Sequence, residues 1–287
     1  MSRPKKRIFS TQESTIKIKG ILINYTEVNP HLKITLIFIH GNSSSSRAWI
    51  KQLESSVFEK FRLIAIDLPA HGNSGSSIYP ERDYNLKTLG KITGEAICAL
   101  TDGNEYILIG ISLGSNILAE ALPYLSPRGI VIAGSCLIGG NITLGSFTKT
   151  ASSSYIGSVD DATEFSIKRY GYQSMMYPKL NDIARFTSDY NRVKNPFRSY
   201  LNTSLEKNRY SDQLSLVVNT GLPLLIIFGE RDAIINPHYL DHIKLKLWKN
   251  KIHNLPNAGH LVNIDQAGIF NTLLRCYADE VLYHYYS

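Results

Sequence analysis

Short apolar runs alternate with segments of helical period along most of the chain. Five runs rich in Ile and Leu are continuous, which is typical of strands buried on both faces of a parallel sheet, and they lie at 34–40, 61–68, 106–111, 129–134 and 222–229. Between them the pattern predicts helices over 46–56, 84–100 and 113–124. This order predicts an α/β fold with a mostly parallel, doubly wound sheet.

The pattern continues on both sides of this region. Before it, Ile16, Ile18, Ile21 and Ile23 alternate with polar residues, which predicts an N-terminal antiparallel hairpin. After it, we expect a helix near 237–246, a strand near 250–255 and a terminal helix near 263–285.

The alternation stops between residues 140 and 218, a stretch too long for a simple loop. We interpret 140–218 as a helical cap inserted into a core domain formed by 1–139 and 219–287. Its aromatic and methionine residues are then suspected of lining a pocket: Tyr155, Phe165, Tyr170, Tyr172, Met175, Met176, Tyr177, Phe186, Tyr190, Phe197, Tyr200 and Tyr210. The alternative is a packing layer whose aromatic residues form only its own core.

Composition narrows the class of protein. With 287 residues, 43% of them hydrophobic and 19% charged, the chain has the make-up of one large globular domain with an insertion. Part of the net charge of +7 comes from the basic N-terminus, which we interpret as a solvated tail because no nucleic-acid-binding signature accompanies it. The three cysteines are far apart, and no apolar segment typical of a secretory signal follows the basic N-terminus, so we expect a cytoplasmic protein. No run of 18 apolar residues occurs, so we expect no membrane partner.

The first candidate catalytic motif is Gly110-Ile111-Ser112-Leu113-Gly114, which lies between a predicted strand and a predicted helix. Gly-x-Ser-x-Gly at such a junction is typical of a nucleophile elbow, in which glycines allow a tight turn. The turn would hold the Ser112 hydroxyl at the N-terminus of the following helix, where backbone N–H groups favour negative charge.

A serine nucleophile needs a general base, and His260 is the best candidate. It lies in a glycine-containing loop after the last predicted strand, and such loops form the crevice of open α/β sheets. His238, His242 and His253 are alternatives, but they lie in predicted helix or strand, where we expect them to face solvent.

The base in turn needs an orienting carboxylate, for which we select Asp232, just after the strand at 222–229. Ser112, Asp232 and His260 then follow the order nucleophile, acid, base. Glu230 is the nearest competitor, and Asp265 is expected to cap or open the last helix.

An oxyanion hole would complete the machinery. The backbone N–H groups of Leu113, after the nucleophile, and of Asn42, in the loop after the first core strand, are the expected donors. The serine run 43–46 could be a linker by composition, but it is too short, and we interpret Ser46 as the N-cap of the helix that carries Trp49.

Five segments in this order resemble the α/β-hydrolase superfamily: "FIHGN" (38–42), "DLPAHGNS" (67–74), "GISLG" (110–114), "FGERD" (228–232) and "NAGH" (257–260). The resemblance runs from about residue 20 to the end, with Ala70 and Ser115 standing where the family commonly has glycine. Within the superfamily, "HGNSSSS", "QLE" and "DLPAHGNS" look like bacterial N-acyl-homoserine lactonases of this fold. This resemblance implies a metal-free serine lactonase with Ser112, His260 and Asp232 as triad, and Asn42 and Leu113 as oxyanion donors.

The expected function is therefore hydrolysis of a small-molecule ester or lactone, without metal or organic cofactor. His40 and His71 lack the spacing of a zinc site and are expected to be hydrogen-bonded structural residues. A serine in the elbow argues against dehalogenases and epoxide hydrolases, whose nucleophile is a carboxylate. A general carboxylesterase, a carbon–carbon bond hydrolase, a perhydrolase and a non-catalytic small-molecule receptor remain alternatives.

Overall fold

The computed structural model describes residues 11–139 and 156–283. In this part of the chain, one eight-stranded sheet has the order β1-β2-β4-β3-β5-β6-β7-β8. Its strands are β1 (Gln12–Ile18), β2 (Ile21–Val28), β3 (Thr35–Ile39), β4 (Arg62–Ile66), β5 (Tyr106–Ile111), β6 (Gly129–Ala133), β7 (Leu224–Gly229) and β8 (His253–Leu255). All pairs from β4 to β8 are parallel, whereas β2 is antiparallel to both β1 and β4. The predicted fold class and its N-terminal hairpin are confirmed.

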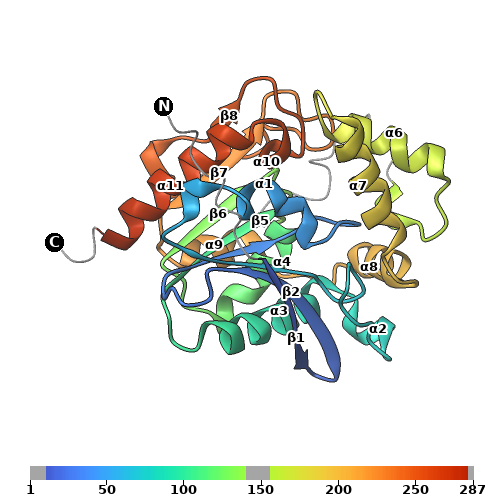
Figure 1. The fold of residues 1–287 in the computed structure, drawn as a ribbon. Helices are drawn as coiled ribbons and strands as arrows, with labels where there is room; N and C mark the ends of the chain where they lie inside the picture. The colour runs from blue at the N-terminus through green and yellow to red at the C-terminus, as the bar shows by residue number, and fades with distance from the viewer. Residues whose placement is uncertain (1–10, 140–155, 284–287) are drawn as a thin grey trace, which may run out of the picture.

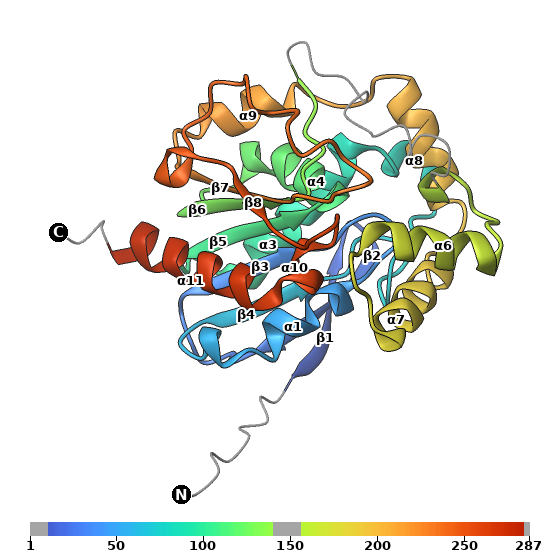
Figure 2. The same cartoon turned by 90° about the horizontal axis from the view of Figure 1, so that it is seen from above.

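Helices cover both faces of the sheet (Figures 1 and 2). One face carries α3 (Leu86–Thr101), α4 (Leu113–Ala121) and α9 (Gln213–Asn219), and the other carries α1 (Ile50–Leu53), α10 (Val262–Asp265) and α11 (Ala267–Tyr283). Two apolar clusters fill the space between these layers, one on each side of the sheet. This double coverage explains why the central strands are continuously apolar.

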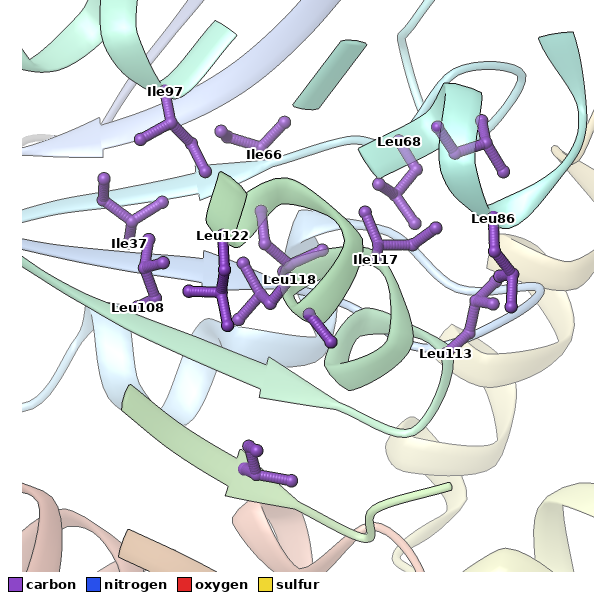
Figure 3. Close-up of a cluster of buried hydrophobic side chains, with 14 of the residues drawn as sticks. Ile37, Ile66, Leu68, Leu86, Ile97, Leu108, Leu113, Ile117, Leu118 and Leu122 are labelled. Atoms are coloured by element: carbon purple, nitrogen blue, oxygen red, sulfur yellow. The ribbon is translucent and has the colours of Figure 1, made fainter. Parts of the chain in front are cut away.

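The cluster on the α3 and α4 side fixes the helix that follows Ser112 (Figure 3). Leu118 of α4 and Leu122 of the turn after it extend toward Ile37 and Leu108 of the sheet, and Ile117 lies in the same cluster nearer the start of α4. All five side chains are nearly or completely buried. The position of the helix N-terminus is therefore set by core packing rather than by surface loops.

The segment between β6 and β7 supplies helices at one end of the molecule. These are α6 (Glu164–Ser174), α7 (Leu180–Asn191) and α8 (Phe197–Glu206), which gather beside the sheet in both views (Figures 1 and 2). The next helix, α9, contacts α4 instead. Residues 140–155 of the predicted cap lie outside the described residues, so the boundaries 140–218 remain a prediction.

Two expectations about helices were wrong. Residues 237–246 form turns and extended chain, because Ile243, Leu245 and Leu247 alternate with lysines and the backbone N–H of Leu224 in β7 bonds to the Lys246 carbonyl. Residues 46–56 do not form one helix: a 3₁₀ turn (η1, Ser46–Trp49) precedes the single α-turn of α1. Ser45, not Ser46, caps η1, because the Ser45 hydroxyl accepts the Arg47 N–H.

Candidate active site

The turn at Ser112 is as tight as its sequence predicts. Ser112 adopts φ 52° and ψ −126°, a conformation that costs a residue with a Cβ about 1–3 kcal/mol. A Cβ on Gly114 would lie 2.3 Å from the Ile39 carbonyl oxygen, and one on Gly110 would lie 2.7 Å from the Gly114 carbonyl oxygen. Only glycine fits at these two positions, so the chain can reverse there and present Ser112 at the N-terminus of α4.

His260 and Asp232 meet at the same edge of the sheet. His260 Nδ1 lies 2.8 Å from Asp232 Oδ2, and both side chains are almost completely buried. The other carboxylate oxygen, Oδ1, accepts the backbone N–H groups of Ile234 and Ile235 at 2.8 and 2.9 Å. The carboxylate is thus held on both oxygens and can fix the orientation of the imidazole.

The imidazole of His260 and the backbone of Ser112 both lie against the end of β6. Ser112 N–H donates to the Ala133 carbonyl at 3.0 Å. The next residue, Gly134, lies so close to the imidazole that an added Cβ would be 3.1 Å from His260 Cε1. Ser112 and His260 also line one pocket, so the structure brings the predicted nucleophile and base together with Asp232.

The loop that carries Asn42 passes close to Ser112. A Cβ on Gly41 would lie 3.1 Å from Ser112 Cβ, and both Asn42 and Leu113 line the pocket. The Asn42 side-chain amide donates to the Gly157 carbonyl at 2.9 Å. The predicted oxyanion donors therefore lie on two sides of the Ser112 turn, one of them at the N-terminus of α4.

Two buried side chains support this loop at Ser43, which has a left-handed φ of 57°. Ser43 N–H donates to His71 Nε2 at 3.2 Å, and Arg198 Nε of α8 donates to Ser43 Oγ at 2.8 Å. The guanidinium also lies 3.7 Å from the centre of the Tyr190 ring. Sequence reasoning missed Arg198, because its partner lies 155 residues earlier in the chain.

The other histidines that the sequence analysis considered differ in burial. His40 and His71 are completely buried and hydrogen-bonded, as expected, and burial lowers the pKa of both. His238 and His242 are exposed. His253 was expected to face solvent, but it is buried in β8, where its ring stacks on Trp248. No group of three or more His, Cys, Asp or Glu residues in the described part of the chain could hold a metal ion.

Asp265, which was expected to cap or open the last helix, is the last residue of α10 and lies two residues before α11. Its Oδ2 accepts the backbone N–H groups of Gly259 and Met176 at 2.8 and 2.9 Å. The Leu261 N–H donates to the Ser174 carbonyl at 2.9 Å. These bonds join the loop that carries His260 to the end of α6.

The pocket between these loops is mostly apolar. Its cavity volume, counted as the space open to the centre of a water molecule, is about 80 Å³. Leu86, Leu113, Leu201 and Leu205 line one part of its wall. Of the suspected aromatic residues, Tyr170, Phe186 and Tyr190 line the pocket, whereas Phe165, Tyr172 and Tyr177 are exposed and Tyr155 lies outside the described residues.

A model of the alpha/beta hydrolase family matches residues 36–272. The chain belongs to the alpha/beta hydrolase family. This confirms the predicted superfamily and a hydrolase fold. No curated protein matches the chain. Among the described residues, no helix is both long and apolar enough to cross a membrane.

Solved structures of similar fold include hydrolases that act on lactones and esters. One is the N-acyl homoserine lactonase AidH, as a mutant with N-hexanoyl homoserine lactone: its TM-score is 0.86 at 22% identity, with 94% of this chain and 98% of that chain covered. AidH with N-butanoyl homoserine also has a TM-score of 0.86, at 23% identity over 94% of this chain and 97% of that one. An esterase from Rhodococcus has a TM-score of 0.77 at 22% identity, covering 95% and 99%. The TM-scores show that this chain shares the fold of these proteins, and at such low sequence identity the similarity shows the fold alone.

Proposed function

We propose that this alpha/beta hydrolase cleaves ester or lactone bonds with Ser112 as nucleophile, His260 as general base and Asp232 as orienting acid. The contact that carries the proposal is the 2.8 Å hydrogen bond between His260 Nδ1 and Asp232 Oδ2. It leaves Nε2 as the ring nitrogen available to a serine proton, in a pocket that Ser112 also lines.

The proposed reaction has two half-reactions. His260 takes the proton from the Ser112 hydroxyl, whose oxygen attacks the substrate carbonyl. The backbone N–H groups of Asn42 and Leu113 stabilise the oxyanion, and His260 returns the proton to the leaving oxygen. Water activated by His260 then attacks the acyl-enzyme, and the proton passes back to Ser112.

The substrate we propose is an N-acyl homoserine lactone, opened at its ring ester with the amide left intact. The apolar pocket supports an acyl chain, since ligand sites commonly combine apolar walls with a few polar groups. The likeness of fold to a lactonase that binds such compounds supports the same choice. Each methylene that is buried in the pocket contributes about 0.8 kcal/mol, so longer chains should react faster until the space is filled.

A substrate panel tests this proposal. Purified protein is incubated with p-nitrophenyl esters and with acyl-homoserine lactones of four to twelve carbons, and products are identified by mass. We expect the lactones to gain the mass of one water. Hydrolysis of p-nitrophenyl acetate with every lactone unchanged would replace the lactonase assignment by a general carboxylesterase.

Ser112→Ala is the matched control for the panel. Loss of a triad nucleophile lowers kcat by a factor on the order of 10⁶, while a methyl group fits the same turn and leaves the fold intact. Circular dichroism and thermal unfolding check the fold. A variant that keeps more than about a hundredth of the wild-type rate would show that Ser112 is not the nucleophile.

A further inference from the structure

A series of buried polar side chains leads from the interior to the pocket. Glu120 Oε1 accepts the backbone N–H of Ser211 at 2.7 Å and Gln213 Nε2 at 3.1 Å. Gln213 Oε1 in turn accepts the backbone N–H of Ile138 at 3.2 Å and Asn116 Nδ2 at 2.7 Å. Glu120, Gln213 and Asn116 are all at least 95% buried. Buried polar groups of this kind are retained only where each is paired.

This series fixes which end of the Asn116 amide faces the pocket. Backbone N–H groups can only donate, so Glu120 Oε1 and Gln213 Oε1 must be acceptors. Asn116 Nδ2 must then be the donor to Gln213, and it also donates to the Cys136 carbonyl at 2.8 Å. The two amide hydrogens are both in use, and Asn116 Oδ1 is left as the acceptor.

In the structure the partner of this acceptor is a thiol. Cys136 Sγ donates to Asn116 Oδ1 at 2.6 Å, and both residues line the pocket. Burial raises the pKa of the Cys136 thiol to about 12, so the thiol keeps its proton at neutral pH. A thiol is nevertheless a weak donor, and the acceptor would form a stronger hydrogen bond with an N–H or O–H group.

The acceptor also lies close to the reacting atoms. Asn116 follows Ser112 by one turn of α4, on the same side of the helix. Ser112, Asn116 and Cys136 all line the same pocket. A substrate whose carbonyl binds at Ser112 can therefore present a group next to that carbonyl to Asn116 within the same pocket.

We infer that Asn116 Oδ1 is a specificity-determining acceptor for a donor carried next to the scissile carbonyl, which in an acyl-homoserine lactone is the amide N–H. In the free enzyme Cys136 occupies this acceptor, and the substrate takes its place. The inference rests on the proposed lactonase function and goes beyond it, because it assigns the recognition of the amide to one atom.

The test compares two lactones that differ in one atom. N-hexanoyl homoserine lactone carries the N–H, and α-hexanoyloxy-γ-butyrolactone has oxygen in its place. The measured quantity is the ratio of kcat/KM for ring opening of the amide to that of the ester analogue, with products identified by mass. A neutral hydrogen bond changes such a ratio by roughly fivefold, so the wild-type enzyme should favour the amide by about that factor.

Two substitutions at Cys136 should shift the ratio in opposite directions. Cys136→Ala removes the competing donor and should raise the ratio by about threefold. Cys136→Ser supplies a stronger competing donor and should lower it below the wild-type value. Cys98→Ala, at an exposed cysteine, should leave it unchanged. Cys136 is a better probe than Asn116, because removing the Asn116 amide leaves buried acceptors without this donor and lowers stability.

The outcomes separate the two proposals. Opposite shifts for the two Cys136 variants support the inference. If wild-type protein opens both lactones and the ratio is the same in all variants, the acceptor assignment is wrong and the lactonase proposal stands. If wild-type protein opens neither lactone, the lactonase proposal fails and the assignment of the amide acceptor fails with it.

Discussion

Asp232 should be the most sensitive residue of the site after Ser112 itself. Its carboxylate is completely buried, bonds to His260 and accepts two backbone N–H groups. Asp232→Asn should lower kcat by a factor on the order of 10⁴, because the amide favours the wrong imidazole tautomer. Steady-state kinetics on any substrate that the wild type cleaves would measure the loss.

Glu230 is the matched control for this prediction. It lies two residues before Asp232 in the same loop, but it is exposed. Glu230→Gln should therefore change kcat only slightly. Should the large loss occur in Glu230→Gln and not in Asp232→Asn, the acid would be assigned to the wrong carboxylate.

The residues that could be predicted from sequence are those marked by local constraints. Gly110 and Gly114 mark Ser112, because no other residue fits the turn. Asp232 and His260 follow the ends of apolar strands, where parallel strands converge. Arg198 and Gln213 lack such a mark: their partners in the site lie 155 and 97 residues away, and only the folded chain brings them together. The position of Asn116 near the site could have been inferred from sequence, because Asn116 lies one helical turn after Ser112.

At the scale of elements, the contact between α3 and α4 depends on one glycine. A Cβ on Gly90 would lie 2.4 Å from Glu120 Cβ and 2.8 Å from the Glu120 carbonyl carbon. Gly90→Ala should force the helices apart and lower the free energy of unfolding by about 2 kcal/mol, although alanine favours the helix itself. Urea denaturation would measure the change.

Gly94, one turn later on α3, separates helix propensity from packing. A Cβ there would lie 3.6 Å from Ala121 Cβ and from Tyr124 Cβ, which is ordinary van der Waals contact. Gly94→Ala should therefore raise the free energy of unfolding by up to about 1 kcal/mol through helix propensity alone. Equal effects of the same sign at both positions would contradict this packing argument.

Element types were predictable where burial leaves a clear pattern and not where a tertiary contact decides the conformation. The central strands were found because they are buried on both faces and therefore have continuous apolar sequence. The segment 237–246 was assigned as helix, although Ile243, Leu245 and Leu247 repeat every second residue. In the structure these residues are extended, and the chain there bonds to Leu224 of β7. A tertiary contact therefore decides the local conformation.

At the scale of the whole molecule, two buried histidines should make the free energy of unfolding depend on pH. His40 and His71 are completely buried, and burial lowers the pKa of both below the usual 6.5. In each ring Nε2 accepts a backbone N–H, from Leu68 and from Ser43 respectively, so protonation would remove an acceptor. The unfolded chain binds more protons than the folded chain just below pH 6.5, and stability should fall as the pH falls through this range.

His71→Gln should weaken that pH dependence. Each histidine that is neutral only in the folded state contributes a slope of up to about 1.4 kcal/mol per pH unit below its unfolded pKa. Removing His71 should reduce the slope between about pH 6.5 and 5.5 by about 1 kcal/mol per pH unit, because the unfolded imidazole is only partly protonated over this range. Urea denaturation at several pH values measures the change. Asp189 and Asp265 act in the opposite sense, because burial raises the pKa of each, but they act nearer the usual 3.8. An unchanged slope in His71→Gln would show that His71 is not the group responsible.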